Sequence, residues 1–312
     1  ALALRTLERL GRTDVAVELS GKGEHVHADT VRARLRAARP EALLVLDMGS
    51  RGEPILEGLP TLVVDHHQPR GFPPGAVVVS AFGHEPVAPT GLLAYELFSG
   101  VTALDDLAWL ALLGTVADLG TDAPFSAVPA LLRRHGRKNV TEAVALLNAP
   151  RRHGDHDVAC ALSVLLGARE PSDIAQGRVE GVDRLRAYRA EVAAEVSRCS
   201  KTRPLFAGRF ALLAFQSRAK VHPLVAQRWL GRLRGKIVIA ANFDYLPGKV
   251  NFAMRSTTGE NLIELLRGLP LPLRGDVAHG HPRATGGSLT HPEFAHLLEA
   301  LGFTGSGVEA RP

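Results

Sequence analysis

The feature that most constrains the fold of this chain is the apolar run Leu62-Val63-Val64, which ends directly in Asp65-His66-His67. A short apolar run bounded by polar residues is typical of a buried strand. Open parallel sheets place their ligand sites at the carboxyl ends of their strands. The pattern therefore predicts an α/β fold in which this strand delivers one carboxylate and two imidazoles to such a site.

Two other segments repeat this arrangement. Residues 43–46 form an apolar run that ends in Asp47, and the apolar stretch 107–113 is followed by Gly114-Thr115-Val116-Ala117-Asp118. A single Asp after an apolar run is more often a turn or helix-capping residue, but three acids and a His pair in this order favour one shared metal site. The candidate metal ligands are Asp47, Asp65, His66 and Asp118.

These residue types indicate which metals would suit the site. Carboxylates together with imidazoles suit Mn²⁺, and Mg²⁺ fits where oxygen ligands dominate. Two such ions about 4 Å apart can activate a water and stabilise both oxygens of an in-line phosphoryl displacement. The acids and imidazoles therefore favour a metal-dependent reaction at phosphorus.

Apolar strands and amphipathic helices alternate along the first part of the chain. We expect strands over 14–19, 42–46 and 62–64 and a helix over 29–38, which together predict a doubly wound, mainly parallel sheet. After residue 89 the pattern is mostly helical, and a charged helical stretch over 179–198 suits a connecting helix. A second, smaller α/β unit follows, with a loop rich in Gly and His over 275–287.

These shifts in pattern predict the domain organisation. We expect a catalytic domain over 1–178, a connecting helix over 179–203, a smaller substrate-binding domain over 204–304 and a tail over 305–312.

The net charge of +5 is unevenly distributed along the chain. Residues 1–200 hold 22 Lys and Arg against 25 Asp and Glu, whereas residues 201–312 hold 15 against 7. An acidic-leaning part with a metal site and a basic part together suit an enzyme that acts on a polyanion. A basic solvated surface without a partner explains the charge alone equally well.

A second group of candidate residues lies in the basic part. The segment from Gly280 to Gly287 combines glycines, which let a backbone approach an anion closely, with an imidazole and a guanidinium. Upstream, Asn251 and Arg255 belong to a predicted strand, where Arg255 could bind phosphate through two hydrogen bonds or form a surface ion pair. The candidate substrate-binding residues here are Asn251, Arg255, Gly280, His281, Arg283, Gly286 and Gly287.

Several of these segments resemble the motifs of one superfamily. Asp-Met-Gly at 47–49, Val-Asp-His-His at 64–67 and Gly-Thr-Val-Ala-Asp at 114–118 resemble the second, third and fourth motifs of the DHH phosphoesterases. The segment 280–287 is similar to the glycine and histidine signature of the DHH-associated C-terminal domain. Asp-His-His-Gln-Pro at 65–69 and Asn-Ala with Arg151-Arg152 after it look most like the RecJ-like exonuclease branch.

The resemblance implies roles for individual residues. Asp47 would bridge two metal ions, with His66 and Asp118 completing one shell and Asp65 acting as a ligand or as a partner that orients an imidazole. Asp65, His66 and His67 would be catalytic, and His67 would lie near the scissile phosphate and bind substrate. Arg255, His281 and Arg283 would hold substrate phosphates from the second domain. The implied cofactor is Mn²⁺, as two ions, with Mg²⁺ possible.

Among the departures from this family pattern, two bear on the chemistry of the site. The first family motif, an Asp-x-Asp segment after an opening strand, is absent, so we expect the given chain to be truncated at its start. The glycine signature reads Ala278-His279-Gly280-His281, in which two of the three family glycines are replaced.

The resemblance leaves three functions open. The first is a metal-dependent phosphodiesterase that degrades single-stranded DNA or RNA from an end. The second is a phosphodiesterase or phosphatase for short oligoribonucleotides, cyclic dinucleotides or phosphoadenosine nucleotides. The third is a degenerate, non-catalytic binding protein of a replication or repair complex, which the retained acids argue against because clustered carboxylates need a cation.

Composition adds limits on where such a protein works. Only Cys160 and Cys199 are present, so a disulfide framework is not expected. No apolar run approaches the roughly 20 residues that a membrane-spanning helix needs. We therefore expect a cytoplasmic enzyme with no membrane contact, and the sequence does not identify a protein partner.

Overall fold

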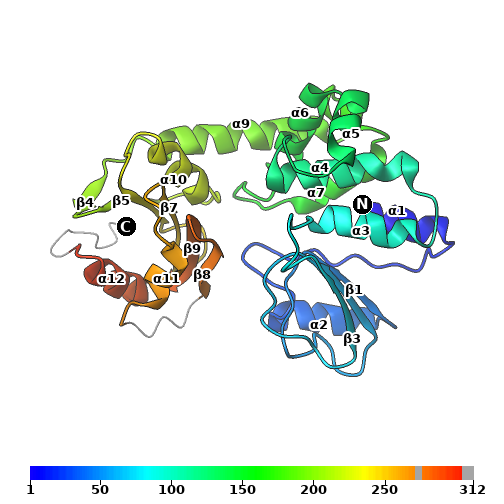
Figure 1. The fold of residues 1–312 in the computed structure, drawn as a ribbon, viewed down its shortest axis with the longest axis horizontal. Coiled ribbons are helices and arrows are strands. Elements are labelled where there is room, and N and C mark those ends of the chain that lie inside the picture. Colours follow the sequence, from blue (N-terminus) through cyan, green and yellow to red (C-terminus); the bar gives the residue numbers. More distant parts are fainter. Residues whose placement is uncertain (271–275, 304–312) are drawn as a thin grey trace. The chain divides into compact units, whose positions relative to one another are not determined.

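The computed structural model of the protein describes residues 1–270 and 276–303, without the side chains of residues 276 and 278–281. The predicted tail, 305–312, lies outside the described residues. The chain divides into two compact units (Figure 1). The N-terminal unit comprises Ala1–Pro150 and Asp157–Arg186, and the C-terminal unit comprises Arg151–His156 and the chain from Ala187 onward.

A three-stranded parallel sheet forms one part of the N-terminal unit. Strands β1 (Leu43–Leu46), β2 (Thr61–Asp65) and β3 (Ala76–Ser80) lie in the order β1-β2-β3. Helix α2 (Asp29–Ala38) precedes β1, and apolar side chains around Val45 and Val63 form a small core with Leu35 of this helix. The parallel register brings the carboxyl ends of β1 and β2 to the same edge, which is where Asp47 and Asp65 lie.

The expected strand over residues 14–19 is wrong. Residues 12–20 have no regular secondary structure, and Val15, Val17 and Leu19 are exposed. A strand needs hydrogen bonds from a neighbouring strand, and in the described residues β1 pairs only with β2. The alternating sequence pattern therefore does not mark a member of the sheet.

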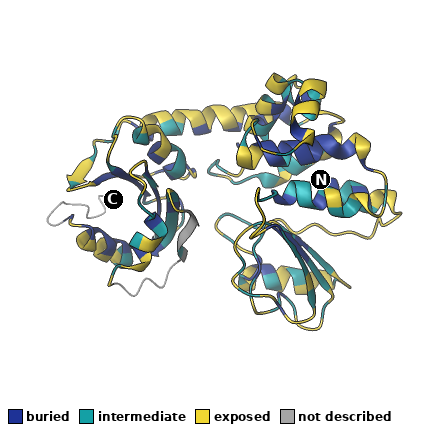
Figure 2. Ribbon diagram, viewed as in Figure 1, coloured by how far each residue is buried: buried dark blue, intermediate teal, exposed yellow. Residues whose placement is uncertain are grey.

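Helices make up the rest of the N-terminal unit. They pack around α4 (Ala108–Leu119), whose residues are buried along most of its length (Figure 2). Gly91 and Gly114 allow α3 and α4 to approach closely, since a Cβ on Gly91 would lie 3.4 Å from Gly114 Cα. The other helices are α1 (Leu2–Arg9), α3 (Thr90–Ser99), the 3₁₀ turn η1 (Asp105–Leu107), α5 (Ala127–His135), α6 (Arg137–Leu147), α7 (Val158–Gly167) and α8 (Pro171–Ala175).

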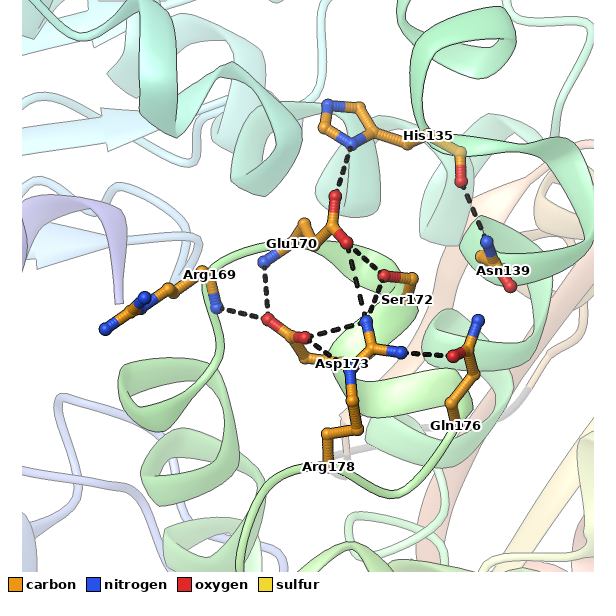
Figure 3. Close-up of polar contacts among 8 residues, drawn as sticks. All are labelled: His135, Asn139, Arg169, Glu170, Ser172, Asp173, Gln176 and Arg178. Atoms are coloured by element: carbon orange, nitrogen blue, oxygen red, sulfur yellow. Dashed lines mark hydrogen bonds and ion pairs between the residues drawn. The ribbon is translucent and has the colours of Figure 1, made fainter.

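A polar network fixes the short helix α8 (Figure 3). The Arg178 guanidinium donates from Nε to Asp173 Oδ1 at 2.9 Å and from Nη2 to Ser172 Oγ at 2.6 Å. Ser172 Oγ in turn donates to Glu170, whose Oε2 lies 3.9 Å from His135 Nδ1 at the end of α5. The network links α5 and α8 and contains none of the candidate site residues, so we assign it to stability.

The C-terminal unit is built on a six-stranded sheet in the order β4-β5-β6-β7-β9-β8. Strands β5 and β6 are parallel, and all other neighbours are antiparallel. The strands are β4 (Leu205–Ala207), β5 (Phe210–Phe215), β6 (Ile237–Asn242), β7 (Lys249–Ser256), β8 (Asp276–His281) and β9 (Ala284–Thr290). Helix α9 (Val182–Cys199), close to the predicted connecting helix, leads from the N-terminal unit into this one.

Both faces of this sheet are covered by helices. Ile237 and Ile239 of β6 face a core with α11 (Leu262–Arg267) and α12 (His291–Ala300). Val238 and Ala240 face a second core with α10 (His222–Leu230) and α9. Every residue of β6 is buried, as expected for a strand packed on both sides. By alternation, Asn242 of β6 and Asn251 and Arg255 of β7 lie on the α10 face.

The expected loop over 275–287 is also wrong. Strands β8 and β9 form an antiparallel hairpin here, with Pro282 and Arg283 at its turn. Gly286 pairs with Ala253, and a Cβ on Gly286 would lie 2.3 Å from Phe252 O. The close approach of β7 and β9 therefore requires glycine at this position. The sequence prediction assigns the glycines of this segment to an anion-binding loop.

No described helix combines the length and the apolar composition that crossing a membrane requires.

Candidate metal centre

Asp47, His66 and His67 come together at the carboxyl edge of the parallel sheet. His66 Nε2 lies 3.4 Å from Asp47 Oδ1, and His67 Nδ1 lies 3.9 Å from the same oxygen. The two imidazole rings are 4.4 Å apart at 77° to each other. Each of the three residues offers one ligand atom within 4.8 Å of the others, so this group could hold a metal ion.

The backbone of Asp47 has a left-handed conformation, with φ of 62°. Asp tolerates this region better than most residues because its short side chain can hydrogen-bond locally. The Asp47 N–H donates to Val64 O at 3.1 Å, which ties the turn to β2, and Thr90 Oγ1 donates to Asp47 Oδ1 at 2.8 Å. The carboxylate is thus held beside the imidazoles although half of its side chain is exposed.

Asp65 is buried and does not belong to the group of three. Its Oδ1 accepts hydrogen bonds from His67 N at 2.6 Å and His67 Nδ1 at 2.9 Å, and its Oδ2 accepts from Gly49 N at 2.7 Å. Burial opposes ionisation, but the hydrogen bonds from His67 and Gly49 outweigh it and lower the pKa of Asp65 to about 2. Asp65 is therefore an ionised anchor whose oxygens are occupied by protein donors.

The hydrogen bond with Asp65 also affects the protonation and the orientation of the His67 ring. Its pKa is raised, first by the hydrogen bond to Asp65, against the effect of burial, and then by the charges of Asp65, Asp47 and Asp118. Since Nδ1 donates to Asp65, Nε2 is the ring nitrogen left to face a ligand. His67 is thus oriented by a carboxylate behind it, as metal-site and phosphate-binding imidazoles commonly are.

Asp118 lies in the last turn of α4, not on a strand. Its side chain is exposed, and its charge contributes to the raised pKa of His67, so it lies near the cluster without belonging to the group of three. The helix ends at its C-cap residue, Gly120, whose φ is 80°. In the structure, Asp47 forms a tight group with His66 and His67, and Asp118 lies outside this group.

The donor set fits a borderline divalent cation. It combines a carboxylate oxygen with imidazole nitrogens, which suit Mn²⁺ better than they suit Mg²⁺ or Ca²⁺. Three negative charges near one another, at Asp47, Asp65 and Asp118, cost stability unless a cation compensates for them. Asp47, His66 and His67 are the residues that could hold it.

The candidate substrate residues lie in the C-terminal unit. Asn251 is buried on β7, and its Oδ1 has no hydrogen-bond partner within the described residues. Arg255 is half-buried and donates to Met254 O at 2.9 Å, while Arg283 is exposed at the hairpin turn. Gly280, His281, Gly286 and Gly287 belong to the hairpin, but the side chain of His281 lies outside the described residues.

Sequence reasoning missed several residues of these regions. In the N-terminal unit these are Thr90 and Gly49, which hold Asp47 and Asp65. In the C-terminal unit, Lys220 N donates to Arg152 O at 2.8 Å, which brings two cations together, and His222 is buried beside them. No local pattern announces these contacts, because the partners are far apart in the sequence.

No model of a protein family matches the sequence, and no curated protein matches it. Solved structures do match. RecJ from Thermus thermophilus in complex with Mn²⁺ superposes with a TM-score of 0.67 at 21% identity, over 96% of this chain and 48% of that one. An exonuclease RecJ bound to manganese gives 0.64 at 20% identity, over 97% and 85%. CDC45 from Entamoeba histolytica gives 0.51 at 9% identity, over 96% and 92%.

These likenesses establish the fold. The chain has the fold of the RecJ structures, with a parallel sheet in one unit and a second sheet in the other. It spans about half the length of the Thermus RecJ chain. The resemblance inferred from the motifs is confirmed at this level, and so is the predicted α/β class.

Proposed function

We propose that this chain is a Mn²⁺-dependent phosphodiesterase that degrades single-stranded nucleic acid from an end. The observation that carries the proposal is the group of Asp47, His66 and His67 at the carboxyl edge of the parallel sheet. Two observations support it: the fold is RecJ-like, and the positive charge is concentrated after residue 200. A strand of nucleic acid is the polyanion that such a basic region would bind.

Each residue of the N-terminal group has a role in this proposal. Asp47 and His66 would hold the ion, with Asp118 completing its shell. When bound, the ion would lower the pKa of a water and offset the charge of the reacting phosphate. Asp65 would act as a positioning residue, since its oxygens are already bound by His67 and Gly49. His67 would donate a hydrogen bond from Nε2 to a phosphate oxygen.

The C-terminal unit would bind the strand. Arg255, Arg283 and His281 are the proposed phosphate contacts, with Asn251 presenting an amide oxygen that has no hydrogen-bond partner in the described part of the chain. We accordingly propose that residues 204–304 act as a substrate-binding domain and residues 1–178 as the catalytic one.

The proposal is tested by cleavage of an end-labelled single-stranded 30-nucleotide DNA and its RNA counterpart, each with Mn²⁺, with Mg²⁺ and with EDTA. We expect stepwise release of mononucleotides with Mn²⁺ and a loss of at least 100-fold in Asp47→Asn. Asp122→Asn is the matched control, because this acid of the same unit is exposed and pairs with Arg137. Its rate should equal that of the unmodified protein.

Other outcomes would redirect the assignment. Cleavage only of dinucleotides or cyclic dinucleotides would move the protein to the short-substrate class. Binding of the strand with no cleavage under any metal condition would contradict the enzyme proposal and favour a binding protein.

A further inference from the structure

A cavity lies under the loop that follows Asp47, separate from the group of three metal-binding residues. Its volume is about 490 Å³, within the range of small-molecule sites. It is lined by residues of the loop 49–60, of β2, and of the segment that leads into β3, together with His27. Gly49 belongs both to this lining and to the anchor of Asp65.

The walls of the cavity are largely aliphatic. Ile55 and Val63 are buried members of the small core of the sheet, and Leu56 packs against that core. Pro54, Pro60, Pro73 and Pro74 add flat, rigid surfaces. These walls suit a planar, uncharged body better than a hydrated ion, because burying a charge without a partner is costly.

One buried polar group faces this apolar lining. His27 lines the cavity, and only 4% of its side chain is exposed. Its Nδ1 lies 3.3 Å from Arg32 Nη2, and since a guanidinium can only donate, Nδ1 is the acceptor and the ring proton is on Nε2. Burial, followed by the charge of Arg51, lowers the pKa of His27 to about 4, so it is a neutral donor near pH 7.

Arg51 supplies a cation at the same cavity. Its side chain is 31% exposed, and its Nη1 lies 3.9 Å from Glu53, which is beyond hydrogen-bond distance. Glycine backbone at Gly49, Gly52, Gly58 and Gly75 adds amide and carbonyl groups to the lining. The cavity thus combines apolar walls with a neutral imidazole, one cation and one acid, Glu57.

We propose that this cavity binds a nucleobase. A base has two flat apolar faces for the aliphatic and proline walls, and ring acceptors for the Nε2–H of His27. Arg51 would contact the base edge or a phosphate attached to its sugar. The base could belong to a free nucleotide or to a nucleic acid strand. This site does not depend on the proposed catalysis, since none of its contacts requires a metal.

The test is adenosine binding to the metal-free protein, measured by calorimetry in EDTA. His27→Leu replaces the imidazole with an apolar side chain and so removes the donor, and we expect affinity to fall about three- to tenfold. Gly52→Leu should abolish binding by filling the mouth, since Gly52 has no positive φ and nothing lies within 4 Å of an added Cβ. Asp47→Asn is the control and should bind adenosine unchanged.

Two further probes identify the source of the base. Tighter binding of a 12-nucleotide strand than of an abasic strand would place a strand base in the cavity, whereas adenosine binding without strand binding would indicate a free nucleotide. Failure of adenosine to bind at millimolar concentration, or binding unchanged in both cavity variants, would overturn the proposal. Because the assay contains EDTA, its failure is distinct from a failure of cleavage.

Discussion

The two sheets of this protein collect charges of opposite sign. The parallel sheet of the N-terminal unit places Asp47 and Asp65 at one edge, with Asp118 of α4 nearby. The sheet of the C-terminal unit has Arg255 on its α10 face, and Lys220 and Arg152 lie close to each other in the same unit. A group of like charges destabilises a fold unless a counter-ion is present. A bound group of the opposite charge would therefore stabilise each unit, as the proposed function requires.

The two groups differ in how they are held. The acidic group is fixed locally, because Asp65 receives its hydrogen bonds from residues at the ends of β1 and β2. The cationic group, which consists of Arg152, Lys220 and Arg255, depends on the loop between β5 and α10. The buried side-chain amide of Asn242 holds this loop through hydrogen bonds. This contrast predicts that the C-terminal group is the more easily disrupted by a single polar substitution.

The largest effect is expected from removing the side-chain amide of Asn242. Asn242 Oδ1 accepts from Ser217 N at 2.9 Å, and its Nδ2 donates to Ser217 O at 2.9 Å and to Ala219 O at 3.0 Å. Asn242→Ala leaves these buried groups unpaired and should lower the free energy of unfolding by about 2–3 kcal/mol. Urea unfolding followed by the fluorescence of Trp229, in a Trp109→Phe background, reports on this unit alone.

Asn251 provides the matched control for this prediction. It pairs with Asn242 in the register of β6 and β7 and is also buried, but its Oδ1 has no partner within the described residues. Asn251→Ala should therefore cost under about 1 kcal/mol of stability. Equal losses of unfolding free energy in the two variants would contradict the conclusion that Asn242 holds the loop and Asn251 does not.

A smaller effect is expected from pH. Burial, followed by the charges of Lys220 and Arg255, lowers the pKa of His222 to about 3. The unfolded chain takes up this proton below about pH 6.5 and the folded chain only near pH 3, so the stability present above pH 6.5 is lost progressively as pH falls through this window. At pH 5 the loss is about 2 kcal/mol.

The same fluorescence measurement checks this prediction. His222→Gln should flatten the dependence of unfolding free energy on pH between 6.5 and 4 in the C-terminal unit. His296→Gln, at an exposed position of α12, should leave the dependence as it is. An unchanged slope in His222→Gln would show that another group governs the acid sensitivity of this unit.

The sequence predicted the parts of this molecule that are encoded locally. The apolar runs before Asp47 and Asp65 became strands with the expected ends, because a buried parallel strand is specified by its own composition. The strand predicted over 14–19 failed because pairing depends on a neighbour that local pattern cannot supply. The loop predicted over 275–287 failed because the segment pairs as a hairpin, in which Gly286 serves the close contact of β7 and β9.

The site shows the same division between local and distant information. Asp47, His66 and His67 lie together at the ends of two neighbouring strands, whereas Asp65 and Asp118, which the motifs also predicted as ligands, stand outside this group. Thr90 was missed because its contact with Asp47 joins residues 43 positions apart. Lys220 was missed because its proximity to Arg152 depends on how the chain returns to the second unit.

The smallest effect should come from neutralising one cation of the second group. Although Lys220 reaches solvent, its pKa is lowered by partial desolvation and then by Arg151 and Arg152, and it has no acidic partner among the described residues. Lys220→Gln should therefore raise the free energy of unfolding of the C-terminal unit by about 0.5 kcal/mol at low salt. The gain should disappear near 1 M salt, where the screening length is about 3 Å.

Lys236→Gln is the control for the small stabilisation expected in Lys220→Gln. Its Nζ donates to Gly208 O at 2.7 Å, so Lys236→Gln removes a charge together with a favourable contact and should not stabilise the unit. If Lys220→Gln instead lowers stability at low salt, Lys220 has a stabilising partner. The conclusion that nearby arginines repel it would then be wrong. If Lys220→Gln raises stability as expected, repulsion between Lys220 and the neighbouring arginines destabilises the free protein. A bound anion would offset this repulsion.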